Sequence, residues 1–257
     1  VAIHVTKQYP KIKIWVNDLY EPLTNFWQQL QHEGNYIYKQ LQQLKSRYPD
    51  PSSAKGLFLD AKESINDLKI DAKDRAVAFY IVNKCSFSGL TESSSFSKQA
   101  SDSNFSMRGI ERIPGFSQLI ERWKITGLSY EDMLSDEKNV FTYLDPPYDI
   151  KDNLYGKKGD MHKSFDHDQF AHNCDNHTGH QLISYNSSQL VKDRFSGWNV
   201  SQFNHTYTMR SVGQYMKNQQ KRQELVIYNY GVPIPKIKFS FGGCYNYKKL
   251  ENEGLVS

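Results

Sequence analysis

The stretch Val140-Phe-Thr-Tyr-Leu-Asp-Pro-Pro-Tyr148 decides how the rest of the chain is interpreted. Its first five residues, Val140 to Leu144, have the pattern of a buried strand. Ligands in open α/β sheets lie at the carboxyl ends of strands, so Asp145 stands where a reactive side chain is expected. The structural alternative is a plain proline turn after a strand.

Strands and helices alternate on both sides of this stretch. Gln181–Tyr185 and Glu224–Tyr228 have the pattern of further strands, and a helix is predicted around Asp166–His177. Upstream, Ile12–Val16 alternates as a strand does, and Glu21–Leu30 has the pattern of a helix. This alternation predicts an α/β fold with a largely parallel sheet.

Residues 36–124 have a helical pattern instead and are predicted to be an insertion into the sheet domain. Apolar residues recur there at helical spacing. They are Ile37, Leu41 and Leu44, then Phe58, Ala61, Ile65 and Leu68, then Phe116, Leu119, Ile120 and Trp123. Residues 86–106 contain nine serines, which predicts a polar loop that either takes part in binding or serves as a linker.

Composition and charge narrow the class of protein. The chain has no apolar run near the length of a membrane span and no signal-peptide pattern, so a soluble protein is expected. Its three cysteines are far apart, which argues against a disulfide scaffold. Residues 125–206 carry seven Lys or Arg against twelve Asp or Glu, whereas residues 207–249 carry eight against one. Such a distribution suits a nucleic-acid enzyme, although ordinary solvated faces explain it equally well.

The Asp-Pro-Pro-Tyr motif suits chemistry on a weakly nucleophilic exocyclic amine, such as that of adenine. Asp145 supplies a carboxylate and Pro146 a carbonyl, two acceptors that would favour a pyramidal nitrogen and direct its lone pair at a methyl donor. Pro147 holds the preceding residue extended, and neither proline has an N–H that could occupy the acceptors. Tyr148 can stack on a base that has left the duplex. Positioning and fixed electrostatics then supply the rate, and no metal is required.

Together with other segments, the motif resembles the Dam-type family of adenine-specific DNA methyltransferases, including phage and restriction–modification members, over nearly all of residues 1–230. The resemblance implies S-adenosylmethionine as cofactor and duplex DNA as substrate, methylated by base flipping. Asp18, after the first strand, matches the family's acidic position for the ribose hydroxyls, although an Asp there is often only a helix N-cap. Ser129 and Tyr130 match the place that holds the cofactor's adenine, and Asp145 is implied to contact the cofactor too.

The segment Asn83-Lys-Cys-Ser-Phe-Ser-Gly89 resembles the family's Asn-Arg-x-x-Phe-Asn-Gly, which lies along the DNA. The resemblance implies that Asn83, Lys84, Ser86 and Phe87 bind DNA. Lys221 and Arg222 lie in the basic stretch beside the last strand and are expected to contact phosphates, and Arg108 is a further DNA-binding candidate. The implied fold is a Rossmann-like methyltransferase sheet with an inserted helical target-recognition region. Residues 1–35 and 120–257 would form the catalytic domain, and residues 36–119 would form the insertion.

Two features depart from the family pattern. The family opens with a Gly-Gly-Lys segment and a strand that ends in Phe-x-Gly-Gly, and neither precedes Val1. Residues Val1 to Tyr9 would then be the helix after that glycine turn. This predicts weak cofactor binding, open sheet edges and self-association through them. Near the C-terminus, Phe241-Gly242-Gly243 is a weaker candidate for a displaced cofactor loop than for part of a basic extension.

Other functions stay open on sequence grounds. Related tetrapeptides serve RNA-base and protein-amide methyltransferases, although the helical insertion favours DNA. A non-catalytic DNA-binding remnant is the alternative from a different class. The histidines around Cys174 lack the short-gap pairs of structural zinc sites, so no metal is expected. They are His162, His167, His172, His177 and His180. We expect a cytoplasmic protein of a bacterial or phage-infected cell.

Overall fold

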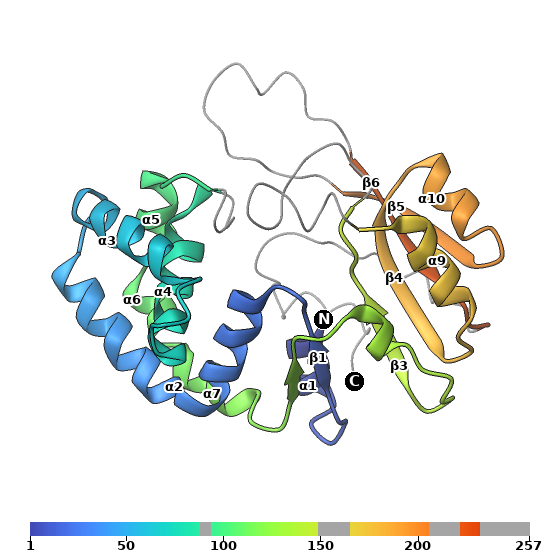
Figure 1. The fold of residues 1–257 in the computed structure, drawn as a ribbon, viewed down its shortest axis with the longest axis horizontal. Coiled ribbons are helices and arrows are strands. Elements are labelled where there is room, and N and C mark those ends of the chain that lie inside the picture. The colour runs from blue at the N-terminus through green and yellow to red at the C-terminus, as the bar shows by residue number, and fades with distance from the viewer. Residues whose placement is uncertain (88–93, 149–164, 206–221, 232–257) are drawn as a thin grey trace, which may run out of the picture. The chain divides into compact units, whose positions relative to one another are not determined.

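The computed structural model describes residues 1–87, 94–148, 165–205 and 222–231 (Figure 1). The chain divides into two compact units. The first comprises Val1–Met133 with Asp152–Phe165, and the second comprises Leu134–Lys151 with Asp166–Ser257. This division differs from the predicted domains, whose boundaries at 35/36 and 119/120 stay a prediction.

The first unit is mainly helical and contains one small parallel sheet. Its helices are α1 (Ala2–Gln8), α2 (Glu21–Arg47), α3 (Pro51–Ser64), α4 (Ala72–Cys85), α5 (Lys98–Asn104), α6 (Met107–Ile110) and α7 (Ile113–Leu119), with a 3-10 helix, η2, at Tyr130–Met133. Strands β1 (Trp15–Asn17) and β2 (Lys124–Thr126) pair in parallel. β1 is shorter and later than the predicted strand, because Tyr9 to Ile12 form a turn closed by an amide-to-carbonyl hydrogen bond of 3.0 Å.

Helix α2 continues well past the predicted end at Leu30 and runs through the predicted boundary at residues 35 and 36. Its 27 residues are interrupted only at Glu33, where φ is −120° and ψ is 24°. At the next residue, a Cβ on Gly34 would collide with the side chain of Ser117 on α7. Glycine therefore lets α2 pass close to α7, and the two helices pack against each other within this unit.

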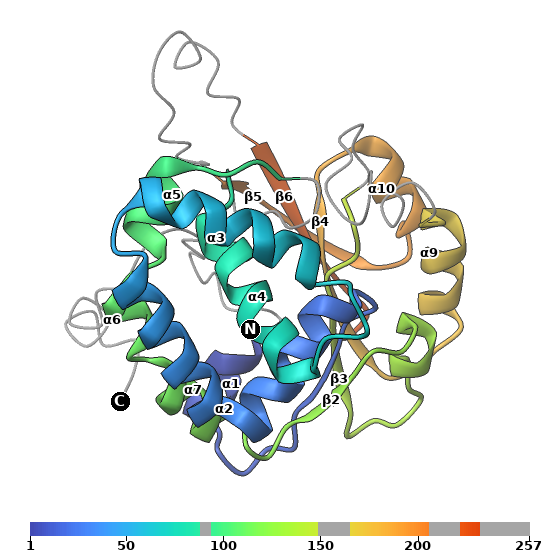
Figure 2. The same cartoon turned by 60° about the vertical axis from the view of Figure 1, so that its left-hand side comes forward.

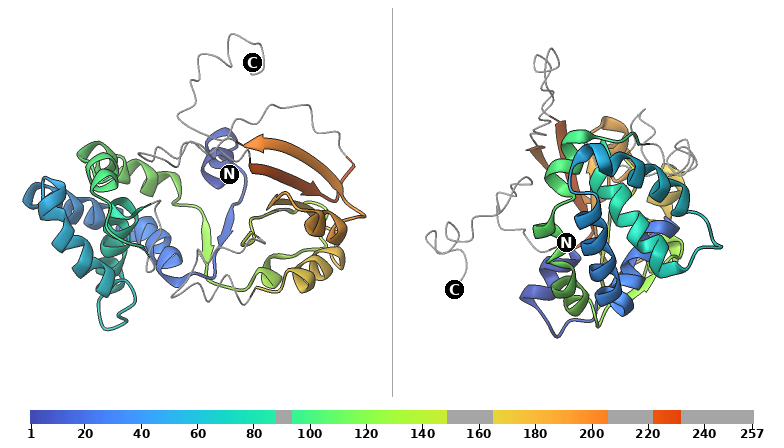
Figure 3. Two further views of the ribbon diagram at one scale, coloured as in Figure 1. Left: turned by 90° about the horizontal axis from the view of Figure 1, so that it is seen from above. Right: turned by 90° about the vertical axis from the view of Figure 1, so that its left-hand side faces the viewer.

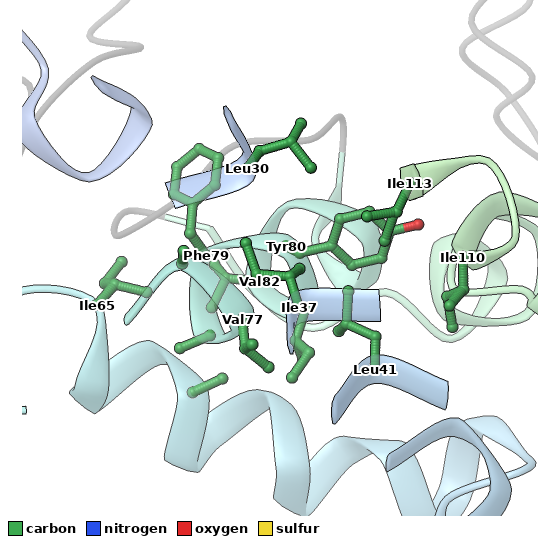
Figure 4. Packing of buried hydrophobic residues seen from close by; sticks show 14 of the residues in the cluster. Leu30, Ile37, Leu41, Ile65, Val77, Phe79, Tyr80, Val82, Ile110 and Ile113 are labelled. Atoms are coloured by element: carbon green, nitrogen blue, oxygen red, sulfur yellow. The ribbon is translucent and has the colours of Figure 1, made fainter. Parts of the chain in front are cut away.

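The core of the first unit lies among α2, α3 and α4 (Figures 2 and 4). Helix α4 is buried almost all round from Arg75 to Val82, as expected of a central helix. Arg75 is held there by an ion pair with Glu21, whose two carboxylate oxygens each lie 2.9 Å from its Nη1. Most of the predicted apolar positions are buried, Leu44, Phe116 and Leu119 are half-buried against the core, and one is exposed. Leu68 is 78% exposed because α3 ends at Ser64.

In its described residues, the second unit has a four-stranded mixed sheet and two helices. Its elements are β3 (Phe141–Leu144), α9 (His167–Asp175), β4 (His180–Asn186), α10 (Gln189–Arg194), β5 (Asn199–His205) and β6 (Arg222–Tyr228). The strand order is β3-β4-β6-β5. Strands β3 and β4 are parallel, whereas β6 is antiparallel to both β4 and β5. Figure 3 shows β5 and β6 as two arrows of opposite direction.

The prediction of a largely parallel sheet is therefore wrong for this unit, where two of the three ladders are antiparallel. Strand β5 escaped the sequence pattern because Val200 and Phe203 are its only large apolar residues. Strands β3, β4 and β5 run in one direction, and β6 runs the opposite way between β4 and β5. The predicted strands at β3, β4 and β6 and the predicted helix at α9 are confirmed.

Side-chain alternation gives this sheet one apolar face and a second face on which polar side chains lie beside Leu182 and Val226. The apolar face is buried, with Leu144, Ile183, Tyr185, Leu225 and Ile227 each at 7% exposure or less. Rings next to it come from α9 and from the residue after α10, Phe170 and Phe195, which lie 6.4 Å from the Tyr185 ring. The helices thus cover one face, and the polar positions of β3, β4 and β6 share the other.

Two further observations concern the described part of the chain. No helix in it is both long enough and apolar enough to cross a membrane. Cys85 and Cys174 are buried there as free thiols, while Cys244 lies outside the described residues.

Candidate active site

The Asp-Pro-Pro-Tyr segment begins where β3 ends. Leu144, the last residue of the strand, is buried and anchors it in the apolar face. Pro146 and Pro147 have no N–H to offer a ladder, so pairing stops at Leu144. Asp145 is exposed, Pro146 is buried, and Tyr148 is half-buried. The carboxylate therefore stays at the carboxyl end of the strand, where the sequence pattern predicted it.

A hydroxyl on the neighbouring strand holds this carboxylate. Ser184 Oγ donates a hydrogen bond of 2.6 Å to Asp145 Oδ1. Leu144 is in register with Ile183, so Asp145 and Ser184 are the next pair along two parallel strands. The Tyr143 hydroxyl lies 2.9 Å from Ser184 Oγ. Sequence reasoning missed both Ser184 and Tyr143, because their proximity to Asp145 depends on the β3–β4 register.

Burial and two neighbouring side chains shift the pKa of Asp145 in different directions. Although the residue keeps an accessible surface, protein surrounds its carboxyl group, and this burial raises the pKa above the usual aspartate value. The hydrogen bond from Ser184 lowers the pKa because it favours the ionised form. The negative charge of Glu224 on β6 raises it again. Burial and the Glu224 charge therefore oppose the Ser184 hydrogen bond, and the pKa of Asp145 is raised.

Tyr148 lies against a buried tyrosine. The rings of Tyr148 and Tyr185 are 6.4 Å apart and inclined by 26°, a stacked arrangement. Tyr185 is 1% exposed, and its hydroxyl is hydrogen-bonded to Nδ1 of His167. The motif tyrosine thus has a fixed ring behind it. The predicted stacking of Tyr148 on a base is not tested by this contact, and Tyr185 is a further residue that the sequence did not indicate.

The predicted cofactor residues Asp18, Ser129 and Tyr130 meet in the first unit, at the carboxyl ends of β1 and β2. Asn17 connects these ends. Its Oδ1 accepts from Thr126 Oγ1 and from the Leu128 amide, each at 2.8 Å, and its Nδ2 donates to the Leu128 carbonyl at 2.8 Å. The Asp18 amide also donates to the Thr126 carbonyl at 3.2 Å. The backbone before Ser129 is therefore fixed beside Asp18.

The side chains in this cluster fit the nucleoside part of S-adenosylmethionine. Asp18 is half-buried, and its Oδ1 accepts from the Tyr20 amide at 2.8 Å, so it does help to start α2. A carboxylate has about four acceptor positions, so a ribose hydroxyl can still bind. Ser129 is exposed and donates to Glu131. Tyr130 is half-buried, with its ring 5.8 Å from that of Phe165, and offers an aromatic surface for a base.

The predicted DNA-binding residues around the end of α4 have unequal exposure. Phe87 is 52% exposed, whereas Ser86 is 1% exposed and forms a β-bridge with Phe96. Lys84 is half-buried, and desolvation lowers its pKa. Asn83 is half-buried, and Arg108 is exposed on α6. Phe87 and Arg108 are therefore open to a ligand as the structure stands, and Ser86 would need a rearrangement to reach one.

Several predicted residues cannot be described. Lys221 and the Phe241-Gly242-Gly243 segment lie outside the described residues, as does His162. Arg222 begins β6, but its side chain is not described. Within the described ranges, no group of three or more His, Cys, Asp or Glu residues could hold a metal ion. There, His177 Nδ1 lies 2.8 Å from the Asn173 carbonyl, a contact within the same turn of chain.

Comparison with known proteins supplies the family. No curated protein sequence matches the chain. Residues 1–223 do match the sequence profile of the D12 class of N6 adenine-specific DNA methyltransferases. The matched range includes Asp18, Tyr130 and the Asp145 motif, and it covers most of the 257 residues. The chain therefore belongs to the D12 class N6 adenine-specific DNA methyltransferase family, whose members transfer a methyl group from S-adenosylmethionine to adenine in DNA.

Proposed function

We propose that Asp145 and the carbonyl of Pro146 accept hydrogen bonds from the two N–H groups of the adenine N6 amine during methyl transfer. The observation that carries this assignment is the Asp145 carboxylate at the end of β3, with Oδ1 bonded to Ser184 at 2.6 Å. The amine is a poor nucleophile because its lone pair is delocalised into the ring. Two fixed acceptors favour the pyramidal amine, in which the lone pair is available.

The carboxylate also stabilises the charge that develops during the reaction. As the amine nitrogen forms its new bond to carbon, positive charge builds on that nitrogen and on its hydrogens. The ionised Asp145 carboxylate is held in place by Ser184, so it attracts this charge from a fixed position. S-adenosylmethionine, when bound, supplies the methyl group as an activated sulfonium donor. The role of the chain is then to position the amine and to accept its hydrogen bonds.

Tyr148 is proposed to stack on the flipped adenine. A base inside a duplex cannot reach the Asp145 carboxylate, so it must leave the helix, and an aromatic ring offsets part of the lost stacking. Tyr148 is two residues from Pro146 and is backed by Tyr185. This backing limits where the Tyr148 ring can lie, which supports a defined orientation of the base against both acceptors.

Asp18, Ser129 and Tyr130 are proposed to hold the nucleoside part of the cofactor. The Asp18 carboxylate would accept from the ribose hydroxyls, and Tyr130 would contact the adenine ring. Asn17 keeps the two strand ends together through three hydrogen bonds of 2.8 Å, which supports a site formed in advance of binding. Preformed contacts of this kind lower the entropy that binding would otherwise cost.

The remaining assignments concern DNA and other chains. We propose that residues 36–119 recognise the target sequence in a Rossmann-like enzyme, with Asn83, Lys84, Ser86, Phe87, Arg108, Lys221 and Arg222 along the DNA. The exposed Phe87 and Arg108 support this surface. Strands β3 and β5 lie at the two ends of their sheet. Free strand edges can pair between molecules, so we also propose self-association through them, to be tested by mass in solution across a concentration series.

Replacement of Asp145 tests the catalytic assignment. Asp145→Ala should lower methyl transfer to duplex DNA by about a thousandfold or more, the scale of losing a charged transition-state contact, while DNA affinity stays within about twofold. Asp193→Ala is the matched control, because Asp193 is an exposed aspartate on α10 whose side chain accepts from Gln189 of the same helix. If Asp145→Ala keeps a tenth of wild-type turnover, the carboxylate is not the acceptor for the adenine amine.

A further inference from the structure

Other polar side chains lie on the same face of the sheet as Asp145. Tyr143 on β3 and Asp145 just after it are two residues apart, so their side chains lie on the same side of the sheet. Ser184 on β4 donates a hydrogen bond to Asp145 and is paired with Val226 on β6. Glu224, two residues before Val226, is on the same face and is 8% exposed. Three consecutive strands thus contribute polar groups around the proposed acceptor.

The hydrogen bonds on this face have a fixed direction. A serine hydroxyl has a single hydrogen, and an ionised carboxylate can only accept. Because Ser184 donates to Asp145 Oδ1 at 2.6 Å, its oxygen must act as the acceptor towards the Tyr143 hydroxyl 2.9 Å away. The order is therefore Tyr143 to Ser184 to Asp145. Burial and the charge of Asp145 raise the pKa of Tyr143, which keeps this donor protonated.

We infer that Tyr143 and Ser184 form a positioning chain for Asp145, engaging Oδ1 so that Oδ2 is directed to the substrate amine. Neither residue touches the reacting atoms, so both are positioning residues. The inference rests on the proposed role of Asp145 and adds the part of the site that orients it. A carboxylate on a short side chain can rotate about its Cα–Cβ and Cβ–Cγ bonds, and a second-layer hydrogen bond removes that freedom.

The positioning chain of Tyr143 and Ser184 also opposes two unfavourable effects at Asp145. Burial and the Glu224 charge both favour the protonated carboxyl group. In that form, the oxygen that carries the proton cannot accept a hydrogen bond from the amine. On this face the titratable neighbours of Asp145 are Tyr143 and Glu224. The Ser184 hydrogen bond favours the ionised form and so extends activity to lower pH. Ser184 should therefore affect both the rate and its pH dependence.

The test is a set of single substitutions assayed with duplex DNA and S-adenosylmethionine across pH. Ser184→Ala should lower kcat by about 10- to 100-fold, the scale of one hydrogen bond to a charged group, with little change in either KM. The acidic limb of its pH profile should move to higher pH. Ser184→Thr keeps the hydroxyl in a β-favouring side chain and should recover most of the rate and the limb. Tyr143→Phe should also lower kcat and move the acidic limb to higher pH, each by a smaller amount.

Matched controls are Ser201→Ala on β5 and Tyr228→Phe on β6, which remove the same groups elsewhere in the sheet. Both should keep wild-type kcat and pH profile. A Ser184→Ala enzyme with the wild-type kcat and acidic limb overturns the inference, as does a change confined to KM. If Ser184→Ala does not fold, Tyr143→Phe decides alone, since it removes only one oxygen. An inactive Asp145→Ala beside an unaffected Ser184→Ala would reject the positioning chain and keep the proposed function.

Discussion

Asp18 and Asp145 both follow a short parallel strand, yet their surroundings differ. Asp18 accepts from the Tyr20 backbone amide and helps to begin a helix. Asp145 accepts from the Ser184 side chain, begins no helix, and has a raised pKa beside Glu224. Each aspartate has a nearby tyrosine, Tyr130 and Tyr148 respectively. These different surroundings suit the two roles that we propose, ligand binding for Asp18 and the acceptance of hydrogen bonds during the reaction for Asp145.

The two tyrosines give the largest contrast. Tyr148→Ala should lower kcat by about 10- to 100-fold, because base–aromatic stacking of that scale would be lost from the flipped adenine. Tyr148→Phe keeps the ring and should stay near wild type. Tyr130→Ala should instead weaken cofactor binding and leave kcat at saturation within about threefold. Rates at saturating DNA and cofactor measure the first effect, and calorimetric titration of S-adenosylmethionine measures the second. Equal kcat losses in the two alanine variants would contradict the division of roles.

The Asp18 substitution sharpens the same comparison. Asp18→Ala should raise the Kd of S-adenosylmethionine by about tenfold, the scale of one or two hydrogen bonds to a charged group. Part of any loss of stability comes from the Tyr20 amide, which loses its acceptor. Asp18→Asn keeps an acceptor for that amide and should recover stability more than affinity. Unchanged cofactor affinity in Asp18→Ala would leave this aspartate with the helix-start role alone.

The smallest effect concerns Glu224 and pH. Since only ionised Asp145 can accept fully, activity is lost as the pH falls through its folded-state pKa, which is raised above the usual aspartate value. Glu224→Gln removes a negative charge that raises this pKa. The acidic limb of kcat/KM should therefore move to lower pH, opposite to the shift in Ser184→Ala. A limb that moves upward or not at all would mean that Glu224 does not act on Asp145.

The sequence indicated the candidate reactive residue better than its supporting residues. Strands β3, β4 and β6 have contiguous apolar residues, so their pattern predicted them and the position of Asp145. Strand β5 has Val200 40% exposed at a sheet edge, and nothing in its composition required burial. Ser184 is 39 residues from Asp145. Its role follows only from the parallel register of β3 and β4, which periodicity along the chain cannot give.

The local role of Asp18 also shows where a pattern is ambiguous. An aspartate between a strand and a helix suits both a helix start and a ribose contact. The hydrogen bond to the Tyr20 amide accounts for the first and occupies only part of the carboxylate. By contrast, Asp145 cannot begin a helix in this way, because the residue two positions after it is Pro147, which has no amide hydrogen to donate. The sequence therefore favours a functional role more strongly at Asp145, where the structural alternative is a plain proline turn, than at Asp18.

Single-turnover methylation of duplex DNA at saturating S-adenosylmethionine tests the central claim most directly. Excess enzyme and saturating cofactor remove differences in affinity, so the measured rate reports on methyl transfer. Asp18→Ala should then return to within about threefold of the wild-type rate, while Asp145→Ala should stay about a thousandfold below it or lower, because a transition-state contact cannot be restored by binding. Recovery of Asp145→Ala under these conditions would contradict the assignment of Asp145 as the acceptor for the adenine amine.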